Sequence, residues 1–526
     1  MLKKKYNSSF YLIILIFVYY FILHFYPTDI HFLNYDWVFL LPIDYIKTGN
    51  SFFMEEVYFR QANTYGYSLF GYFLIDILGL PKNSIIMRIP SVFGNLLIFY
   101  SGYKILKFEK IEDKTFIWAF LLLLNPILWI YSGRVSTDIL GSSLAFFAFS
   151  IFYINKKYEK FLLSSILFSI SIIIKYHAFI FSICFAYLIF LREKNISKFI
   201  IKNINFFILP VLTLLVFTLI NYQKFDVILF SQKFQNLFSD DKDNYIIALF
   251  NFLYFSSIFF APCLFLYYFE FLKEKKFQIL FCLTGISVLA IYIINPNFVS
   301  SHGEMNFGTH FLVKGGQGEL NFGTDLGFVE LGEINIFYFF LPWFIYFIIK
   351  NSGKDFLKAE SIKYVIIVLL IFFYILFPNL RTTQRYLIFI LPVLILFFVI
   401  NYDINKLKDK FTKFAWLIVI LFQLSINFYF SSYQILVSQM ISNTINYVDN
   451  KKIRLDYCAD VSPFIGYYYK KDCMKRNTEP NYYLDAKDIY ALDLVILDEF
   501  TVEKKFSANF FGKDLKSIYV LKRYEQ

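Results

Sequence analysis

The chain has 526 residues, of which 58% are hydrophobic, 22% aromatic and only 17% charged. A soluble protein of this length would carry about a quarter charged residues, so the composition excludes an ordinary soluble protein and indicates a polytopic membrane protein. The net charge of +11 comes mostly from short basic segments between apolar runs. Such segments suit anionic lipid headgroups, and we expect no nucleic-acid partner.

Thirteen apolar runs approach the roughly 20 residues that cross a bilayer. They cover residues 10–26, 85–106, 116–131, 138–154, 161–175, 177–192, 199–221, 246–271, 277–294, 335–350, 362–377, 386–401 and 412–430. The first run follows Lys3, Lys4 and Lys5 and lacks a small-residue cleavage site. We therefore expect a retained anchor rather than a signal peptide.

The basic residues predict the orientation in the membrane. With the N-terminus in the cytoplasm, the inner segments hold 23 lysines and arginines and the longer outer loops hold 11. This bias is the positive-inside rule. An odd number of spans then predicts that the C-terminus lies on the extracytoplasmic side of the membrane.

The outer segments of appreciable length are 27–84, 222–245, 295–334 and the tail 433–526. We expect a transmembrane domain over 1–432 and a separate small extracytoplasmic domain over 433–526. Within the first loop, residues 38–47 and 68–80 are amphipathic, which is typical of segments that lie along the membrane interface.

The third outer loop contains a near-duplicate, because "GEMNFGT" at 303–309 returns as "GELNFGT" at 318–324. Its glycines suit a hairpin or two hinged flaps, and we expect a lid or an acceptor-binding loop there. The polar candidates in the repeat are His302, Glu304, His310 and Glu319. Their spacing matches no known ligand pattern, so the sequence leaves open whether this loop binds a divalent metal.

The tail predicts a small α/β domain. "KIRLDYC" (452–458), "LVIL" (494–497) and "SIYVLKR" (517–523) have the composition of strands, and "PFIGYYYKK" (463–471) that of a helix. Cys458 and Cys473 lie in this domain, on the oxidising side of the predicted topology. Either a disulfide or two unpaired thiols fits their spacing.

Ionisable residues at membrane depth are costly and are usually functional. Near the predicted outer ends of the spans the chain carries Asp36, Arg60, Arg88, Arg134, Asp138, Lys175, His177, Arg381 and Arg385. All lie on one side of the membrane. A one-sided set of acids and cations indicates chemistry at the outer surface on an anionic molecule, whereas a transporter more often carries charge at mid-span.

Several of these residues stand in motifs that resemble the GT-C glycosyltransferases of polyprenyl-phosphate sugars, the protein O-mannosyltransferase and lipid A aminoarabinose transferase group. The motifs are "NYDWVFLLPIDYIKTGNSFF" (34–53), "MRIPSVFGNLL" (87–97), "SGRVSTDILGSSLAFF" (132–147), "LPWFIYF" (341–347) and "RTTQRYLIFILPVLIL" (381–396). The resemblance implies an α-helical polytopic membrane protein of GT-C type. The lysine that aminoarabinose transferases carry later in the first loop is missing from "FRQANTYGYSLF" (59–70).

The resemblance also implies a sugar donor on a polyprenyl phosphate and a lipid, polysaccharide or protein acceptor. Asp36 would take the proton from the acceptor hydroxyl, and transfer would invert the anomeric centre. Four arginines would neutralise the donor phosphate: Arg134, Arg381, Arg385 and Arg60. Asp138 would be a second acid of the site, and Lys175 and His177 would line its cavity.

Other interpretations of these residues stay open. Asp36 and Asp138 also suit helix N-caps, Arg381 and Arg385 suit interfacial anchors, and Arg88 suits loop packing. At the level of the whole protein, an O-antigen ligase or polymerase shares the lipid-linked donor. A flippase or exporter of lipid-linked glycans would also explain the spans and the arginines, but it would not need Asp36.

Overall fold

The structure is a computed structural model, and it places most of the helical part of the chain and part of the C-terminal tail. It describes residues 2–25, 39–48, 66–155, 159–193, 195–225, 249, 253, 256–257, 259–294, 330–331, 334–335, 340–352, 361–376, 384–452, 457–458, 482–487 and 500–523.

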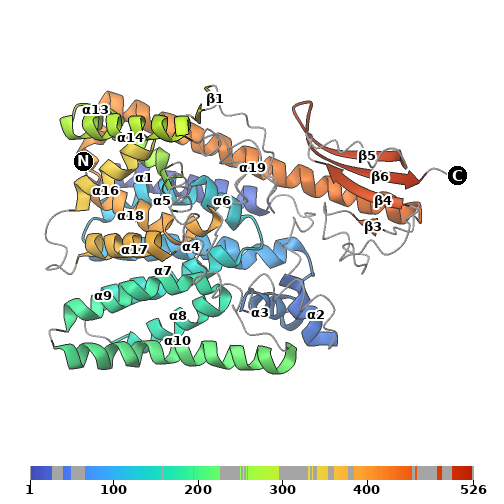
Figure 1. The fold of residues 1–526 in the computed structure, drawn as a ribbon, viewed down its shortest axis with the longest axis horizontal. Coiled ribbons are helices and arrows are strands. Elements are labelled where there is room, and N and C mark those ends of the chain that lie inside the picture. The colour runs from blue at the N-terminus through green and yellow to red at the C-terminus, as the bar shows by residue number, and fades with distance from the viewer. Residues whose placement is uncertain are drawn as a thin grey trace.

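Long helices run side by side along the longest axis of the molecule (Figure 1). The first half of the chain forms α1 (Leu2–Phe25), α2 (Leu41–Thr48), α3 (Gly66–Tyr72), the π-helix η3 (Phe73–Ile77), α4 (Ser84–Phe108), the 3₁₀ turn η4 (Glu112–Lys114), α5 (Thr115–Leu123), α6 (Pro126–Ser132), α7 (Thr137–Ile154), α8 (Phe161–Ile174), the 3₁₀ helix η5 (Tyr176–Phe181), α9 (Ser182–Arg192) and α10 (Ile196–Phe225). The second half forms α13 (Tyr268–Leu272), α14 (Lys275–Ile294), α16 (Phe340–Ser352), α17 (Ile362–Leu376), η9 (Gln384–Phe389), α18 (Leu391–Asn401), η10 (Ile404–Lys408) and α19 (Lys410–Asn450).

The helical membrane architecture expected from the sequence is present. Among the described residues, α4, α7, α10 and α19 are long and apolar enough to span a bilayer, and α5 with α6 would make a fifth span if the bent pair crosses together. Most other predicted spans coincide with shorter apolar helices, such as α8, α17 and α18. The protein is therefore a mostly helical membrane protein, and the count of thirteen crossings stays a prediction.

One predicted span, 116–131, is not a continuous helix. α5 and α6 meet at a bend of 66°, because Pro126 begins α6 and cannot continue α5. Side-chain amides satisfy the backbone at the break: Asn427 Nδ2 donates to Leu124 O at 3.0 Å, and Asn125 Oδ1 accepts from Leu128 N at 3.4 Å. A broken helix at membrane depth needs such partners, since lipid offers none.

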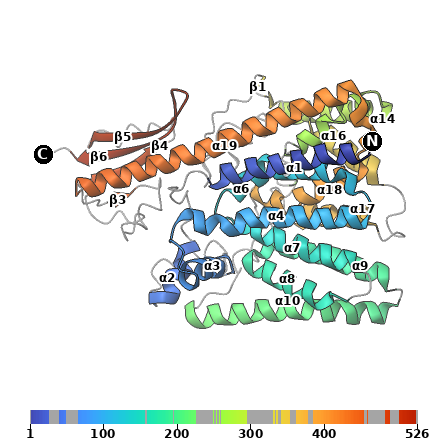
Figure 2. The same cartoon turned by 180° about the vertical axis from the view of Figure 1, so that it is seen from behind.

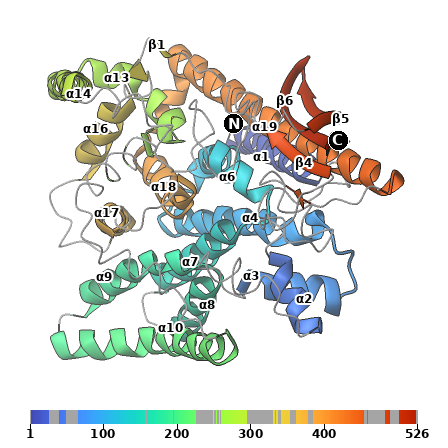
Figure 3. The ribbon, with the colours of Figure 1, turned by 45° about the vertical axis from the view of Figure 1, so that its right-hand side comes forward.

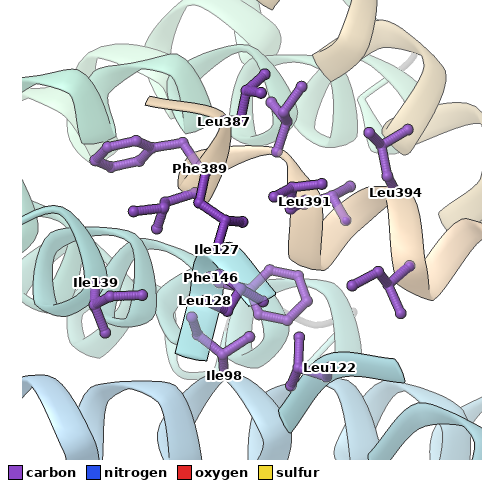
Figure 4. Packing of buried hydrophobic residues seen from close by; sticks show 14 of the residues in the cluster. Ile98, Leu122, Ile127, Leu128, Ile139, Phe146, Leu387, Phe389, Leu391 and Leu394 are labelled. Atoms are coloured by element: carbon purple, nitrogen blue, oxygen red, sulfur yellow. The ribbon is translucent and has the colours of Figure 1, made fainter. Parts of the chain in front are cut away.

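A buried apolar cluster joins the helices beneath the ionisable residues. Figure 4 shows Ile98, Leu122, Ile127, Leu128, Ile139, Phe146, Leu387, Phe389, Leu391 and Leu394 packed together. These side chains come from α4, α5, α6, α7, η9 and α18 and are at most 3% exposed. The cluster fixes η9 and the start of α18 against α7, although more than 200 residues separate them along the chain.

Two short helices of the first predicted outer loop lie at the end of the bundle opposite the N-terminus (Figure 3). α2 and α3–η3 match the amphipathic segments predicted at 38–47 and 68–80. Two ion pairs join them to their surroundings, Lys47 with Asp76 and Lys82 with Asp44. Lys47 is exposed and Asp76 is mostly buried, and the hydrogen bond to Asp76 raises the pKa of Lys47 above its ordinary value.

The tail packs a small sheet on the far half of α19 (Figure 2). Its four strands are β3 (Tyr457–Cys458), β4 (Tyr482–Lys487), β5 (Phe500–Phe510) and β6 (Lys513–Arg523), in the order β3-β4-β6-β5. β3 pairs parallel to β4, and the other pairings are antiparallel. A separate pair, β1 (Glu330–Leu331) and β2 (Ile334–Asn335), is antiparallel.

The observed tail refines the predictions. The strands expected at 452–458 and 517–523 are present in part, whereas β4 and β5 were not predicted. α19 continues past residue 432 to Asn450, so the proposed domain boundary falls inside a helix. The segments 463–471 and 494–497 and Cys473 lie outside the described residues. The same holds for residues 226–245 and 303–328, and the disulfide and the lid stay predictions. The first four residues of the loop predicted at 222–245 belong to α10, which ends at Phe225.

Candidate functional site

The first element of the candidate site is the start of α7, where the sequence "GRVSTD" turns into a helix. Ser136, in extended backbone conformation, is the N-cap, and its Oγ accepts a hydrogen bond from Ile139 N at 3.4 Å. Ser91 of α4 fixes this corner, because Ser136 N donates to Ser91 Oγ at 2.9 Å. Asp138 is therefore not the N-cap. It lies in the first turn, where the helix dipole favours a carboxylate.

Asp138 forms an ion pair with Lys175, the residue that ends α8. Lys175 Nζ lies 3.5 Å from Asp138 Oδ1, and the two side chains are only 5% and 6% exposed. Breaking a buried ion pair by removing one member is costly, because it leaves an uncompensated charge.

A glycine permits this pairing. A Cβ added at Gly141, three residues after Asp138 on α7, would lie 2.8 Å from Lys175 Cβ. That separation is shorter than real Cβ contacts, so a larger residue would force α7 and the end of α8 apart. Gly141 therefore allows the two helices to approach closely enough for Lys175 to reach the carboxylate.

The third element is η9, which brings an aromatic ring to the pair. His177 of η5 stacks on Tyr386 with ring centroids 3.9 Å apart and an interplanar angle of 18°. Lys175 Nζ lies 5.4 Å from the centroid of the same Tyr386 ring, within the range of a cation–π contact. Ser142 of α7 donates to Ile388 O at 3.2 Å. Three segments that are distant in sequence thus meet around Asp138.

The two neighbouring arginines differ in their surroundings. Arg88 is 4% exposed and donates from Nη1 to Gly133 O at 3.0 Å and from Nε to Ser84 O at 3.2 Å. It thereby links α4 to the end of α6, the packing role expected of it. Arg134 follows Gly133 and is also 4% exposed, which places a second buried guanidinium four residues before Asp138.

The helices of the first predicted outer loop are attached directly to this corner. A Cβ at Gly66 would lie 2.8 Å from Ile173 O, next to Lys175, so α3 packs closely on the end of α8. Tyr67 donates to Met87 O at 2.7 Å and lies 2.8 Å from Ser91 Oγ, the atom that also contacts Ser136.

The attachment continues to the start of α2. Ser68 donates to Phe39 O at 2.8 Å, and the rings of Phe39 and Tyr67 lie 5.3 Å apart. Hydrogen bonds thus run from the start of α7 through α4 and α3 to Phe39, three residues after Asp36 in the sequence.

The structure brings together only part of the predicted site. Asp138, Arg134, Lys175 and His177 lie at one end of the bundle, and Arg385 belongs to η9 beside Tyr386. The other predicted site residues lie outside the described ranges: Asp36, Arg60, Arg381, His302, Glu304, His310 and Glu319. Within those ranges, no group of three or more metal-ligating side chains occurs.

Some residues of the site were missed by sequence reasoning. Tyr386 stands in the quoted "QRYLIF" and Gly141 in "DILGSS", but nothing local in those segments shows which helix they face. Ser91 and Ser136 are common residue types whose pairing requires α4 and α7 to be packed. The one local indication was the Arg-Tyr pair at 385–386, which stands in a motif that resembles the GT-C enzymes. That motif led to Arg385 as a predicted site residue, and not to Tyr386.

No protein-family model and no curated protein matches the sequence. Among solved structures, the chain is similar to ArnT from Cupriavidus metallidurans, whose crystal structure was determined in the apo state. The match covers 98% of each chain at 9% sequence identity with a TM-score of 0.44.

Proposed function

We propose that the protein is an integral-membrane glycosyltransferase of GT-C type, which moves a sugar from a polyprenyl phosphate to an acceptor hydroxyl at the end of the bundle that holds Asp138. The observation that carries the proposal is the buried pair of Asp138 and Lys175 with Arg134 beside it. Buried ionisable groups at one end of a membrane bundle are expensive, and chemistry on an anionic substrate is a common reason for them.

The attachment of the first loop supports Asp36 as the base. Three residues of extended chain span at most about 11 Å, so Asp36 cannot lie further than that from Phe39, which is tied to α3 by Ser68. A carboxylate there would take the proton of the acceptor hydroxyl as it attacks the sugar. Attack opposite the leaving phosphate would invert the anomeric centre.

The cations would stabilise the leaving phosphate. Negative charge grows on the phosphate as the glycosidic bond breaks, and arginine donors offset it through paired hydrogen bonds. Arg134, Arg381 and Arg385 are our candidates, with Arg60 in a lesser role. The first loop lacks the lysine of aminoarabinose transferases, and Lys175 is an additional cation on which the site can draw.

The distribution of charge favours an enzyme over a transporter. In the described helices α4, α7, α10 and α19, each Asp, Glu, Lys or Arg lies within about two turns of a helix end. Transport of a lipid-linked glycan would be served by cations near the bilayer midplane. An O-antigen ligase or polymerase remains the nearer alternative, because it uses a similar donor but transfers a whole glycan.

The experiment is Asp36→Asn in the purified protein, supplied with membrane lipid extract from the source cells, with release of sugar from polyprenyl phosphate as the readout. Loss of a general base lowers the rate by about 10²–10⁴-fold, and we expect such a loss with retained fold and donor binding. Asp44→Asn is the matched control, since Asp44 is an exposed acid of the same loop paired with Lys82.

Wild-type activity in the Asp36→Asn variant would contradict the assignment and bring the transport interpretation forward. Release of an oligosaccharide instead of a single sugar would favour the ligase or polymerase.

A further inference from the structure

The β5–β6 hairpin ends in an unusual turn. Phe510 pairs with Lys513, which leaves Phe511 and Gly512 as the two residues of the loop, with φ of +49° and +82°. Positive φ at both central residues is the pattern of a type I′ turn, which favours Asn, Asp or Gly at both positions. Gly512 satisfies this preference, and Asn509 Oδ1 accepts from Gly512 N at 2.9 Å. A bulky aromatic residue at Phe511 is an outlier.

Packing within the chain does not account for the aromatic side chain. Phe511 is 91% exposed, the highest value among the exposed large apolar residues of the described chain. Its ring contacts that of Phe510 at 4.5 Å, and the opposite side is open. A single exposed apolar residue would need no explanation, but one held out of the protein on a strained backbone is the kind of outlier from which a function can be inferred.

The turn lies at the level where the apolar surface of α19 ends. Phe510 contacts Tyr429 of α19, with ring centroids 5.3 Å apart. Among the described side chains of α19, the exposed large apolar residues are Phe411, Phe414, Leu417, Ile418, Leu421, Phe422 and Phe428, and none of those described follows Phe428. Beyond it, the exposed described residues of the helix are Gln439, Asn443, Asn446, Asp449 and Asn450.

This change of surface marks the edge of the hydrocarbon region. A helix of 41 residues is about 60 Å long, twice the roughly 30 Å of the bilayer core, so α19 must leave the membrane part-way along. The switch from apolar to polar exposed residues places that exit near Tyr429. The hairpin turns back along α19 toward the bundle (Figures 1 and 2), which brings Phe511 to the exit.

We propose that the β5–β6 turn is a membrane anchor, with Phe511 inserted among the lipid headgroups and upper acyl chains beside α19. Aromatic residues are favoured in this interfacial zone, and the exposed ring continues the apolar band that ends at Phe428. The anchor would hold the C-terminal sheet close to the membrane surface.

The test uses the full chain reconstituted in vesicles of phosphatidylethanolamine and phosphatidylglycerol, with acyl chains brominated near the headgroup as contact quenchers. Phe511→Trp adds a fluorophore at the turn, and its emission is obtained as the difference from the wild type. The matched control is Val502→Trp, an exposed apolar residue of β5. It lies nine residues from the turn, about 30 Å along the strand.

We expect the added emission of Phe511→Trp to be blue-shifted and to fall by at least half in brominated vesicles, with little change for Val502→Trp. Unquenched, red-shifted emission from Phe511→Trp would overturn the anchor. Equal quenching of both variants would also overturn it, because the whole hairpin would then lie on the membrane. A second variant, Phe511→Asn, relieves the turn and keeps the hairpin folded. It should raise protease accessibility of the tail in vesicles but not in detergent, and an equal rise in both would contradict the proposal.

Discussion

The pair of Asp138 and Lys175 can be tested at the scale of single residues. Removing one member of a buried pair typically costs about 3–5 kcal/mol, whereas replacing both by uncharged groups costs much less. We therefore expect Asp138→Asn and Lys175→Met each to lower the thermal midpoint of the solubilised protein. The double variant should recover much of the loss, and a double-mutant cycle of the unfolding midpoints measures the coupling.

Measuring sugar transfer distinguishes a pair that only supports packing from a pair that acts in the site. If both residues act in the site, the double variant regains stability but not sugar transfer. Recovery of both would show that the pair only supports packing, and additive losses of stability would show that the 3.5 Å contact contributes no coupling.

Gly141 gives a second prediction at this scale. A Cβ added there would meet Lys175 Cβ, which is fixed to the backbone and cannot move aside as the end of a flexible side chain could. Gly141→Ala must displace the end of α8, and overpacking of this kind typically costs about 1–3 kcal/mol. We expect lower thermal stability and weaker transfer. Gly285→Ala on α14 is the matched control, since a Cβ there meets nothing within 4 Å. Equal behaviour of the two variants would contradict the close approach.

At the scale of elements, α19 offers a pH-dependent prediction at its start. Asp409 is the N-cap, and Thr412 N donates to Asp409 Oδ2 at 2.9 Å. This backbone hydrogen bond, with that of the Thr412 hydroxyl, lowers the pKa of Asp409 below its ordinary value. A lowered folded-state pKa means that the charge stabilises the helix above the ordinary pKa. That stabilisation is lost as pH falls through the lowered one.

We expect Asp409→Ala to lower the unfolding midpoint at neutral pH, with Asp409→Asn in between because asparagine also caps helices. The gap between the wild type and both variants should shrink as pH falls below about 3.9, the ordinary aspartate pKa. A gap that stays constant over this range would show that the charge of Asp409 is not involved.

The same scale shows what the sequence could predict. Hydropathy located α4, α7, α10 and the two amphipathic helices of the first loop, because burial in lipid acts on each segment separately. It could not show the bend between α5 and α6, which depends on Asn427 from a distant helix to satisfy Leu124 O. The sequence also left open whether Asp138 is the N-cap of α7, since Ser136 and Asp138 both suit the position and contacts with Ser91 distinguish them.

The sequence predicted which residues belong to the candidate site but not which of them contact one another. The position of these residues on one side of the membrane was inferred from charge and topology. The structure places Lys175 in contact with Asp138, and His177 follows in η5. The partners within the group required three-dimensional information. Tyr386 became part of the site because η9 packs on α7, and Lys175 reached Asp138 because position 141 is a glycine. Packing between distant segments leaves no periodic trace in a single sequence.

At the scale of the whole molecule, the orientation of the protein in the membrane decides which kind of sugar donor can reach the site. The N-terminus and the C-terminal sheet lie at opposite ends of the bundle, and α2 and α3 lie toward the sheet (Figure 1). α3 packs on the end of α8, where Lys175 pairs with Asp138. The excess of basic residues in the predicted inner segments predicts a cytoplasmic N-terminus, and with that orientation the site would face outward. We expect a green fluorescent protein fused to the N-terminus to fluoresce in a bacterial host. An alkaline phosphatase fused after Gln526 should be active.

The reverse result, a non-fluorescent N-terminal fusion and an inactive C-terminal phosphatase, would place Asp138 and Lys175 on the cytoplasmic side. The two orientations imply different donors. Outside the membrane no nucleotide sugar is at hand, so a transferase there depends on a lipid-carried sugar and on cations that receive its phosphate. A cytoplasmic site would remove that requirement. The polyprenyl-phosphate donor would then lose its main physical support, even if Asp36→Asn abolished transfer.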